Sequence, residues 1–189
     1  MKKIFALATS LLFVSSFLFA QKEKKTVSKV KVPIDSITHL ITYEEVVQAQ
    51  NLSADAIYNR ALSWFRKYFK NPNEVIRKND MVTHVIVGKP RFKIYNPADK
   101  EGTRTDAGLV QFTITVSVKE GRLKYELTEF NWRQTSYYAA ERWLDTSAQS
   151  YSKVYEDYLR QLDEYVRALI DDLKNFVPAT TPVKDKDNW

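Results

Sequence analysis

The sequence predicts a single α+β domain in which two helices cover one face of an antiparallel sheet. Three patterns indicate this architecture: a strand with strictly alternating apolar and polar residues, two segments with the apolar spacing of amphipathic helices, and the order strand, helix, strands, hairpin, long helix. A sheet that is apolar on one side needs a cover, and the two amphipathic helices supply it. We expect this domain to occupy residues 37–177.

The first twenty residues have the pattern of a secretory signal peptide. Lys2 and Lys3 precede an apolar run over residues 4–19, and Ala20 is a suitable residue before a cleavage site. The run is shorter than the roughly 20 residues that span a bilayer, so an uncleaved anchor is the weaker alternative. We therefore expect an exported protein, cleaved after Ala20 and located in the periplasm or outside a Gram-negative-type cell, with no transmembrane segment after cleavage.

The positive charge of the chain lies mainly outside the predicted domain. Residues 21–36 are expected to form a flexible basic arm, and residues 178–189 a tail. The formal net charge is +6, but residues 32–183 carry 20 Lys and Arg against 20 Asp and Glu. Nucleic-acid binding normally needs a concentrated basic surface, so a neutral body argues against it.

The first strand and helix follow directly from residue spacing. Residues 34–47 are rich in β-branched and aromatic side chains and predict a strand. Ser53 is a suitable N-cap for the helix that follows, in which apolar residues recur at spacings of three and four. Asn71-Pro72-Asn73 should end this helix.

Short strands are expected in the middle of the chain. Residues 74–78 and 81–87 flank Asn79-Asp80, which predicts a tight hairpin turn. A further strand is expected over residues 91–95, followed by a polar loop over residues 96–108.

The clearest strand covers residues 109–118, where apolar and polar residues alternate strictly from Val110 to Val118. Residues 119–122 form a hairpin loop, and residues 123–127 alternate again on the return strand. After an irregular aromatic stretch, residues 150–177 predict one long amphipathic helix.

Three stretches resemble a family of exported bacterial proteins, catalogued as domain of unknown function 4468 and described as having a TATA-binding-protein-like (TBP-like) fold. They are ITYEEVV at residues 41–47, LSADAIYNRALSWF at 52–65 and FTITVSVKEGRLKYELTEF at 112–130. The resemblance covers residues 32–130, about half of the chain. It implies the TBP-like fold but no established activity, and a fold name does not imply DNA binding.

The most unusual segment, residues 130–143, combines aromatic side chains with arginines, a composition typical of binding hot spots. The candidate ligand- or partner-binding residues are Trp132, Arg133, Tyr137, Tyr138, Arg142 and Trp143. The alternative is that these side chains fill the corner between the sheet and the long helix.

A second candidate surface is the basic region over residues 60–100, which holds ten Lys and Arg against three acids. It is most simply a solvated surface, but it would also suit an acidic partner or an anionic membrane.

The sequence offers no assembled catalytic centre. It has no Cys, only His39 and His84, and no cluster of glycines for a phosphate, so we predict no catalytic residue, metal or cofactor. Adjacent acids such as Asp163-Glu164 and Asp171-Asp172 diverge around a helix and are expected on its solvated face.

These observations predict a non-catalytic exported binding or interaction domain, whose partner is an unidentified protein or other component of the envelope. Two alternatives stay open: a periplasmic hydrolase with two facing carboxylates, and a peripheral protein that docks on anionic lipid through basic residues. The pattern carries no signal for the identity of the ligand or for the oligomeric state.

Overall fold

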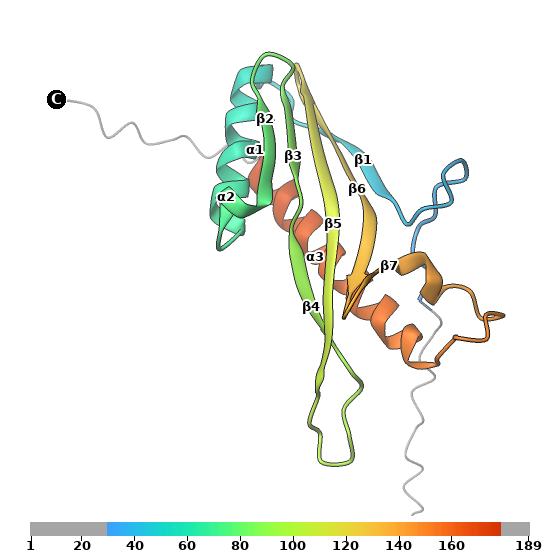
Figure 1. Ribbon diagram of the computed structural model, residues 1–189. Helices are drawn as coiled ribbons and strands as arrows, with labels where there is room; N and C mark the ends of the chain where they lie inside the picture. Colours follow the sequence, from blue (N-terminus) through green and yellow to red (C-terminus); the bar gives the residue numbers. More distant parts are fainter. Residues whose placement is uncertain (1–29, 179–189) are drawn as a thin grey trace, which may run out of the picture.

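A seven-stranded antiparallel sheet forms one layer of the structure, and two long helices form the other (Figure 1). This computed structural model describes residues 30–178, so the predicted signal peptide, most of the predicted arm and most of the tail lie outside the described residues. The elements are β1 (Tyr43–Gln48), α1 (Ala54–Tyr68), α2 (Pro72–Val75), β2 (Ile76–Asp80), β3 (Val85–Gly88), β4 (Arg91–Tyr95), β5 (Asp106–Lys119), β6 (Arg122–Arg133), β7 (Tyr137–Ala139), the 3-10 helix η1 (Ala140–Trp143) and α3 (Val154–Phe176).

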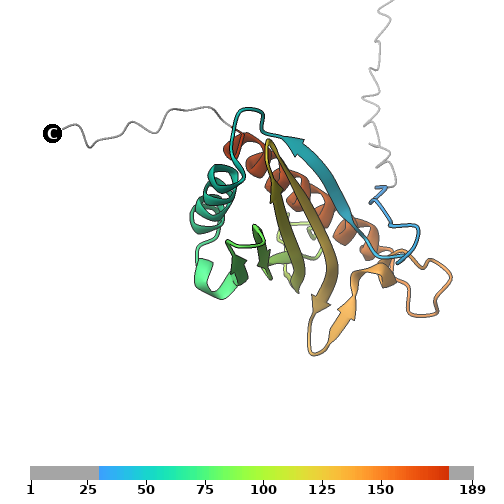
Figure 2. The ribbon, with the colours of Figure 1, turned by 90° about the horizontal axis from the view of Figure 1, so that it is seen from above.

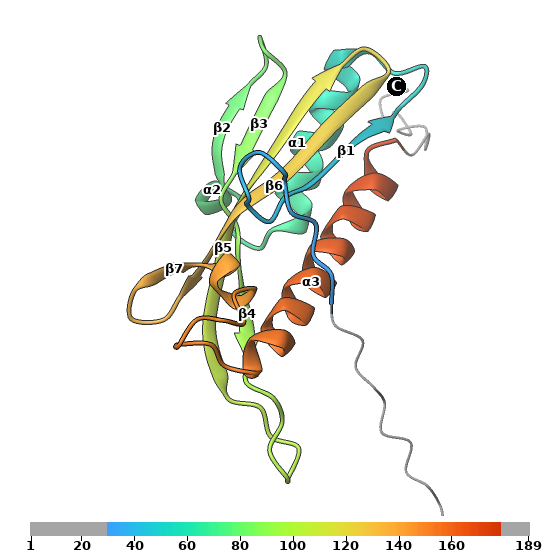
Figure 3. The same ribbon diagram turned by 90° about the vertical axis from the view of Figure 1, so that its right-hand side faces the viewer.

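The order of the strands is β1-β6-β5-β3-β2. β5 is long enough to pair with two short strands in succession: β3 lies beside Ile114–Ser117 and β4 beside the start of β5. β7 pairs with the end of β6. The β5–β6 hairpin is therefore the centre of the sheet, as Figure 3 shows.

The predicted one-sided sheet is confirmed. Val110, Ile114 and Val116 of β5 are fully buried, whereas the alternating Thr113 and Thr115 on the other face are partly exposed. Both α1 and α3 lie on the buried side of the twisted sheet (Figure 2). The prediction of an antiparallel α+β architecture covered on one face is thus correct.

Aromatic side chains join the sheet to α3. Phe92 of β4 stacks on Tyr165 of α3 with ring centroids 4.0 Å apart, and Phe112 of β5 stacks on Phe130 of β6 at 5.2 Å. Burial raises the pKa of Tyr165 to about 12. Phe112 also meets Tyr165 edge-on at 6.3 Å, so the rings form one continuous cluster.

The predicted N-cap of α1 is confirmed. The Ser53 hydroxyl accepts a hydrogen bond from the Ala56 N–H at 3.2 Å, and Asp55 lies in the first turn. On the buried face, the Trp64 indole N–H donates to Asp172 of α3 at 2.6 Å. This bond fixes the two helices side by side above the sheet.

The predicted strand over residues 34–47 begins too early. Asp35 accepts hydrogen bonds from the backbone N–H groups of Ile37 and Thr38, and these bonds form a turn that competes with strand pairing. The strand itself begins at Tyr43. The end of the predicted arm also belongs to the domain, because Val32 is buried and Ile34 bridges Ile41.

The predicted hairpin turn at Asn79-Asp80 is wrong. These two residues pair with Ile86 and Val85 inside the strands, and the chain turns between Met81 and His84. The Asp80 carboxylate accepts from the N–H groups of Val82 and Thr83, which holds the turn two residues later. The strand predicted over residues 74–78 also begins later, because Glu74 and Val75 belong to α2. Pro72 is a favourable first residue for this helix.

The stretch after residue 127, predicted to be irregular, continues β6 through a β-bulge. Gln111 pairs with Asn131 and Thr113 with Thr128, so β6 has one extra residue opposite Phe112. Glu129 lies in this bulge, and its backbone is in the left-handed region with φ of 56°. Leu127 and Phe130 consequently both face the core, although their spacing is odd.

Two further boundaries differ from the prediction. β5 begins at Asp106, so the polar loop after β4 ends three residues earlier than residue 108. α3 begins at Val154 rather than at residue 150, and Lys153 at its N-cap position makes no capping bond through its side chain.

The Asp80 turn should make stability depend on pH. Hydrogen bonds from the backbone and side chain of Thr83 lower the pKa of Asp80 from 3.8 to about 2. A lowered folded-state pKa adds stability above the unfolded value, and this contribution is lost as the pH falls from about 4 to about 2. We expect the free energy of unfolding of the native protein, measured with urea, to fall more steeply over this range than that of the Asp80→Asn variant. The control is Asp171→Asn on the exposed side of α3; parallel profiles for all three proteins would contradict the prediction.

Candidate functional site

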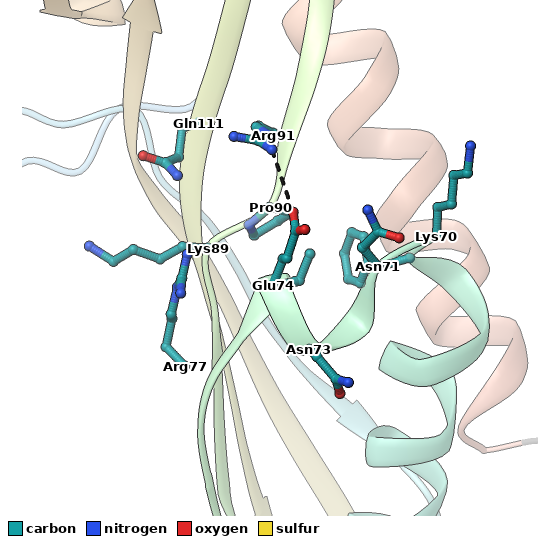
Figure 4. Close-up of a pocket in the computed structure, with 11 residues that line it drawn as sticks. Lys70, Asn71, Asn73, Glu74, Arg77, Lys89, Pro90, Arg91 and Gln111 are labelled. Atoms are coloured by element: carbon teal, nitrogen blue, oxygen red, sulfur yellow. Dashed lines mark ion pairs between the residues drawn. The ribbon is translucent and has the colours of Figure 1, made fainter.

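The basic groove lies where β2, β3 and β4 meet the short helix α2, and it encloses about 390 Å³ (Figure 4). Its charged lining comprises Lys70, Glu74, Arg77, Lys89 and Arg91. Amides of Asn71, Asn73 and Gln111 complete the polar lining. Four cations therefore surround one carboxylate.

The charges of the groove are only partly balanced. Arg91 lies 3.5 Å from Glu74, and Lys89 lies 3.6 Å from Glu129 on β6. All four side chains are about half exposed, so these long pairs hold their partners weakly. Lys70 and Arg77 form no ion pair with any described residue. Figure 4 shows Lys70 on one side of the Arg91–Glu74 pair and Arg77 with Lys89 on the other.

The groove exists because the chain changes direction sharply at two places. Gly88 ends β3 against α1, where a Cβ would lie 2.8 Å from Phe65 Cε1, so only glycine allows this close approach. Lys89 then donates its N–H to Val75 O at 2.8 Å, and Pro90 directly precedes β4. This junction places Lys89 and Arg91 beside α2.

The structure brings together four of the ten cations in the predicted basic region. Others are paired elsewhere, as Lys78 is with Asp80 and Lys93 with Asp106. Arg60 reaches the Val177 carbonyl oxygen at 3.3 Å. The sequence indicated the region but not the amides of the groove. Asn71 and Asn73 were predicted only as the end of the first helix, and Gln111 only as a polar position of its strand.

The aromatic segment divides into a buried and an exposed part. Trp132 and Trp143 are buried and pack together at 5.6 Å, and both contact Tyr158 of α3. They fill the corner between sheet and helix, which was the alternative interpretation. Trp132 also donates its indole N–H to Ala107 O at 2.8 Å.

The other four residues of this segment lie at the surface. The Arg133 guanidinium lies over the Tyr137 ring at 5.5 Å, and Arg142 lies over Tyr138 at 4.7 Å. The second pair, Arg142 with Tyr138, borders a cavity of about 210 Å³. The lining of this aromatic cavity is Trp132, Gln134, Tyr138, Arg142, Trp143 and Tyr155. Gln134 and Tyr155 were not among the predicted residues, and Arg133 and Tyr137 are not part of the lining.

A larger hollow of about 530 Å³ lies between β1 and α3, but most of its charged groups already have partners on the chain. Tyr125 and Lys174 both donate to Glu45, at 2.9 and 2.8 Å. The Lys174 bond is the main reason that the pKa of Glu45 is lowered. Tyr43 donates to Asp163 at 2.8 Å, and burial raises the pKa of Tyr43. This network joins the edge of the sheet to α3.

Several acids of α3 are structural rather than solvated, contrary to the prediction. Asp163 accepts from Tyr43 and Arg167, and Asp172 accepts from Trp64. Asp157 binds Arg104 at 2.9 Å and also Arg160. His84 contacts Asp55 through Nε2 at 2.7 Å. Among residues 30–178, no group of three or more His, Asp or Glu side chains is arranged to hold a metal ion.

The family comparison identifies the central part of the chain. A family model described as a domain of unknown function (DUF4468) with TBP-like fold matches residues 43–133. The central part of the chain is therefore similar to that family. The match spans β1 to the end of β6 and therefore includes the basic groove, whereas η1 and α3 follow it.

Two solved structures share the fold. One is a DUF4468 family protein from Bacteroides ovatus, which is 20% identical to this chain and superposes with a TM-score of 0.63. The match covers 80% of this chain and 94% of the Bacteroides ovatus chain. A TBP-like protein from Parabacteroides distasonis is 14% identical with a TM-score of 0.54, covering 77% of this chain and 98% of its own. No curated protein matches the sequence. No helix in the described part of the chain is long and apolar enough to cross a membrane.

The two tryptophans of the corner should respond differently to truncation. Trp132→Phe leaves the Ala107 carbonyl oxygen without its indole donor, whereas Trp143 Nε1 has no partner among the described residues. We expect Trp132→Phe to lower the free energy of unfolding by about 1 kcal/mol more than Trp143→Phe. Urea unfolding of both variants measures this difference, and equal losses would contradict it.

Proposed function

We propose that this protein is an exported, non-catalytic binding domain that holds an anionic group of an envelope component in the basic groove. The observation that carries the proposal is the excess of cations in the groove, where Lys70 and Arg77 have no carboxylate partner in the described region. An anion bound there would form ion pairs with two unpaired cations and could accept hydrogen bonds from three side-chain amides. The weak Arg91–Glu74 and Lys89–Glu129 pairs would yield to it at little cost.

The proposed absence of catalysis is supported by the roles of the carboxylates. Asp157, Asp163 and Asp172 each accept hydrogen bonds that hold α3 to other elements. A hydrolase with two facing carboxylates would need such groups free to contact a substrate. The same anionic chemistry can come from a lipid headgroup, so docking on a membrane surface is the alternative that the binding test distinguishes.

Binding of an anion by the groove predicts a specific charge effect. The test variant is Arg77→Gln/Lys89→Gln, and the probes are inorganic pyrophosphate in solution and phosphatidylglycerol vesicles. At about 1 kcal/mol per cation, the variant should bind its probe about 30-fold more weakly than the native protein. Calorimetry measures the soluble probe, and sedimentation measures the vesicles.

The matched control is Lys119→Gln/Arg122→Gln, which removes one Lys and one Arg at the β5–β6 hairpin, outside the groove. It should bind as the native protein does. Binding of pyrophosphate supports a soluble or polymeric anion, and binding of vesicles alone supports the membrane alternative. Equal losses in both variants, or no binding of either probe, would refute the groove.

Export is tested separately from binding. Expressed in full length in a Gram-negative host, the chain should be found in the periplasm or medium with Gln21 as its first residue. Leu12→Arg, which places a charge in the apolar run, should leave the protein uncleaved inside the cell. A full-length native protein in the cytoplasm would contradict export; cell fractionation and N-terminal sequencing decide between the outcomes.

A further inference from the structure

Trp143, which lines the aromatic cavity, has an unusual polar group. Trp143 is 1% exposed, and its indole Nε1 has no hydrogen-bond partner among the described residues. The other two described tryptophans each have an acceptor on the chain, Asp172 for Trp64 and Ala107 O for Trp132. Buried indole N–H groups are normally paired, so an exception calls for an acceptor from outside the fold.

The cavity beside Trp143 supplies further donors. Gln134 contributes a side-chain amide with no bond to a described residue, and Arg142 contributes a guanidinium that forms no ion pair in the described part of the chain. No carboxylate belongs to the lining. The site is therefore electropositive and has more donors than acceptors. A ligand that complements it must carry acceptors, and preferably a negative charge.

The other walls of the cavity are aromatic. Trp132, Tyr138 and Tyr155 come from β6, β7 and α3, so three separate elements fix their positions. Trp132 and Tyr138 have ring centroids 6.1 Å apart, and Trp143 and Tyr155 are 6.3 Å apart. Rings in such positions pack against a flat, mainly apolar molecule.

The size of the cavity limits the ligand. Its volume of about 210 Å³ is below the usual range for drug-sized ligands, which starts at about 300 Å³. One six-membered ring with a short substituent suits this space. A second cavity of about 110 Å³, which Trp143 also borders, is lined by Glu156 and mainly apolar residues and would repel an anion.

We infer that the aromatic cavity binds a small six-membered-ring compound that carries a carboxylate. The ring packs between the aromatic walls, and the carboxylate accepts hydrogen bonds from Arg142 and from the Trp143 indole. This site lies in a different part of the molecule from the basic groove and does not depend on the proposed function. The compound is either a planar aromatic acid or a sugar acid, and the experiment distinguishes the two.

The probes are benzoate and glucuronate, with benzyl alcohol and glucose as their uncharged counterparts. Calorimetry on the purified protein should give a dissociation constant of about 1 mM or lower for one acid, at least tenfold below that of its uncharged counterpart. In a spectrum of ¹⁵N-labelled indoles, the Trp143 signal, assigned from Trp143→Phe, should shift on binding. The indole N–H groups of Trp64 and Trp132 already have acceptors, so their signals should move less.

Arg142→Gln should weaken binding of the acid about tenfold. The matched control is Arg133→Gln, which removes the same charge from the neighbouring Arg133–Tyr137 pair outside the cavity. Arg77→Gln/Lys89→Gln should also bind the acid normally, which separates this site from the basic groove. Binding of benzoate alone identifies an aromatic acid, and binding of glucuronate identifies a sugar acid. Equal binding of charged and uncharged compounds, equal effects of the two arginine variants, or an unmoved Trp143 signal would overturn the inference.

Discussion

The packing of Phe112 against Phe130 and Tyr165 is the contact on which the rest of the molecule depends, because it joins the two central strands to the covering helix. The β-bulge at Glu129 makes this contact possible. Without the extra residue, alternation from Leu127 would turn Phe130 and Trp132 toward the open face of the sheet. The left-handed backbone of Glu129 is thus a local cost that keeps two large aromatic side chains in the core.

The two candidate sites follow from how this sheet ends. β5 is longer than any strand on its outer side, so β3 and β4 share it and meet at Lys89-Pro90. The interruption leaves the basic groove beside α2. At the other end, β6 continues past the bulge to Trp132, where η1 and α3 close the corner and leave the aromatic cavity. Both sites are therefore consequences of strand length, together with the break at Lys89-Pro90 for the groove and the β-bulge at Glu129 for the cavity.

Charge has two distinct roles in the structure. On α3, carboxylates accept hydrogen bonds from tyrosine, tryptophan and arginine side chains of other elements and hold the helix in place. Acids that the sequence suggests are solvated therefore have a structural role. In the basic groove the reverse holds: cations from the segment after α1, from β2, from the β3–β4 junction and from β4 outnumber the carboxylates. The unequal distribution within a neutral body, rather than the net charge of the chain, gives the groove its character.

The sequence by itself determined the fold class, the Ser53 cap, the β4 strand and the burial of one face of β5, because these depend on local spacing and local capping. It also indicated both the basic region and the aromatic segment. Only the tertiary structure decided the position of the Asp80 turn, the bulge at Glu129 and the partners of the α3 acids. It alone separated Arg142, at a cavity, from Arg133, outside it. These features depend on contacts between residues far apart in the chain, and residue spacing carries no information about such contacts.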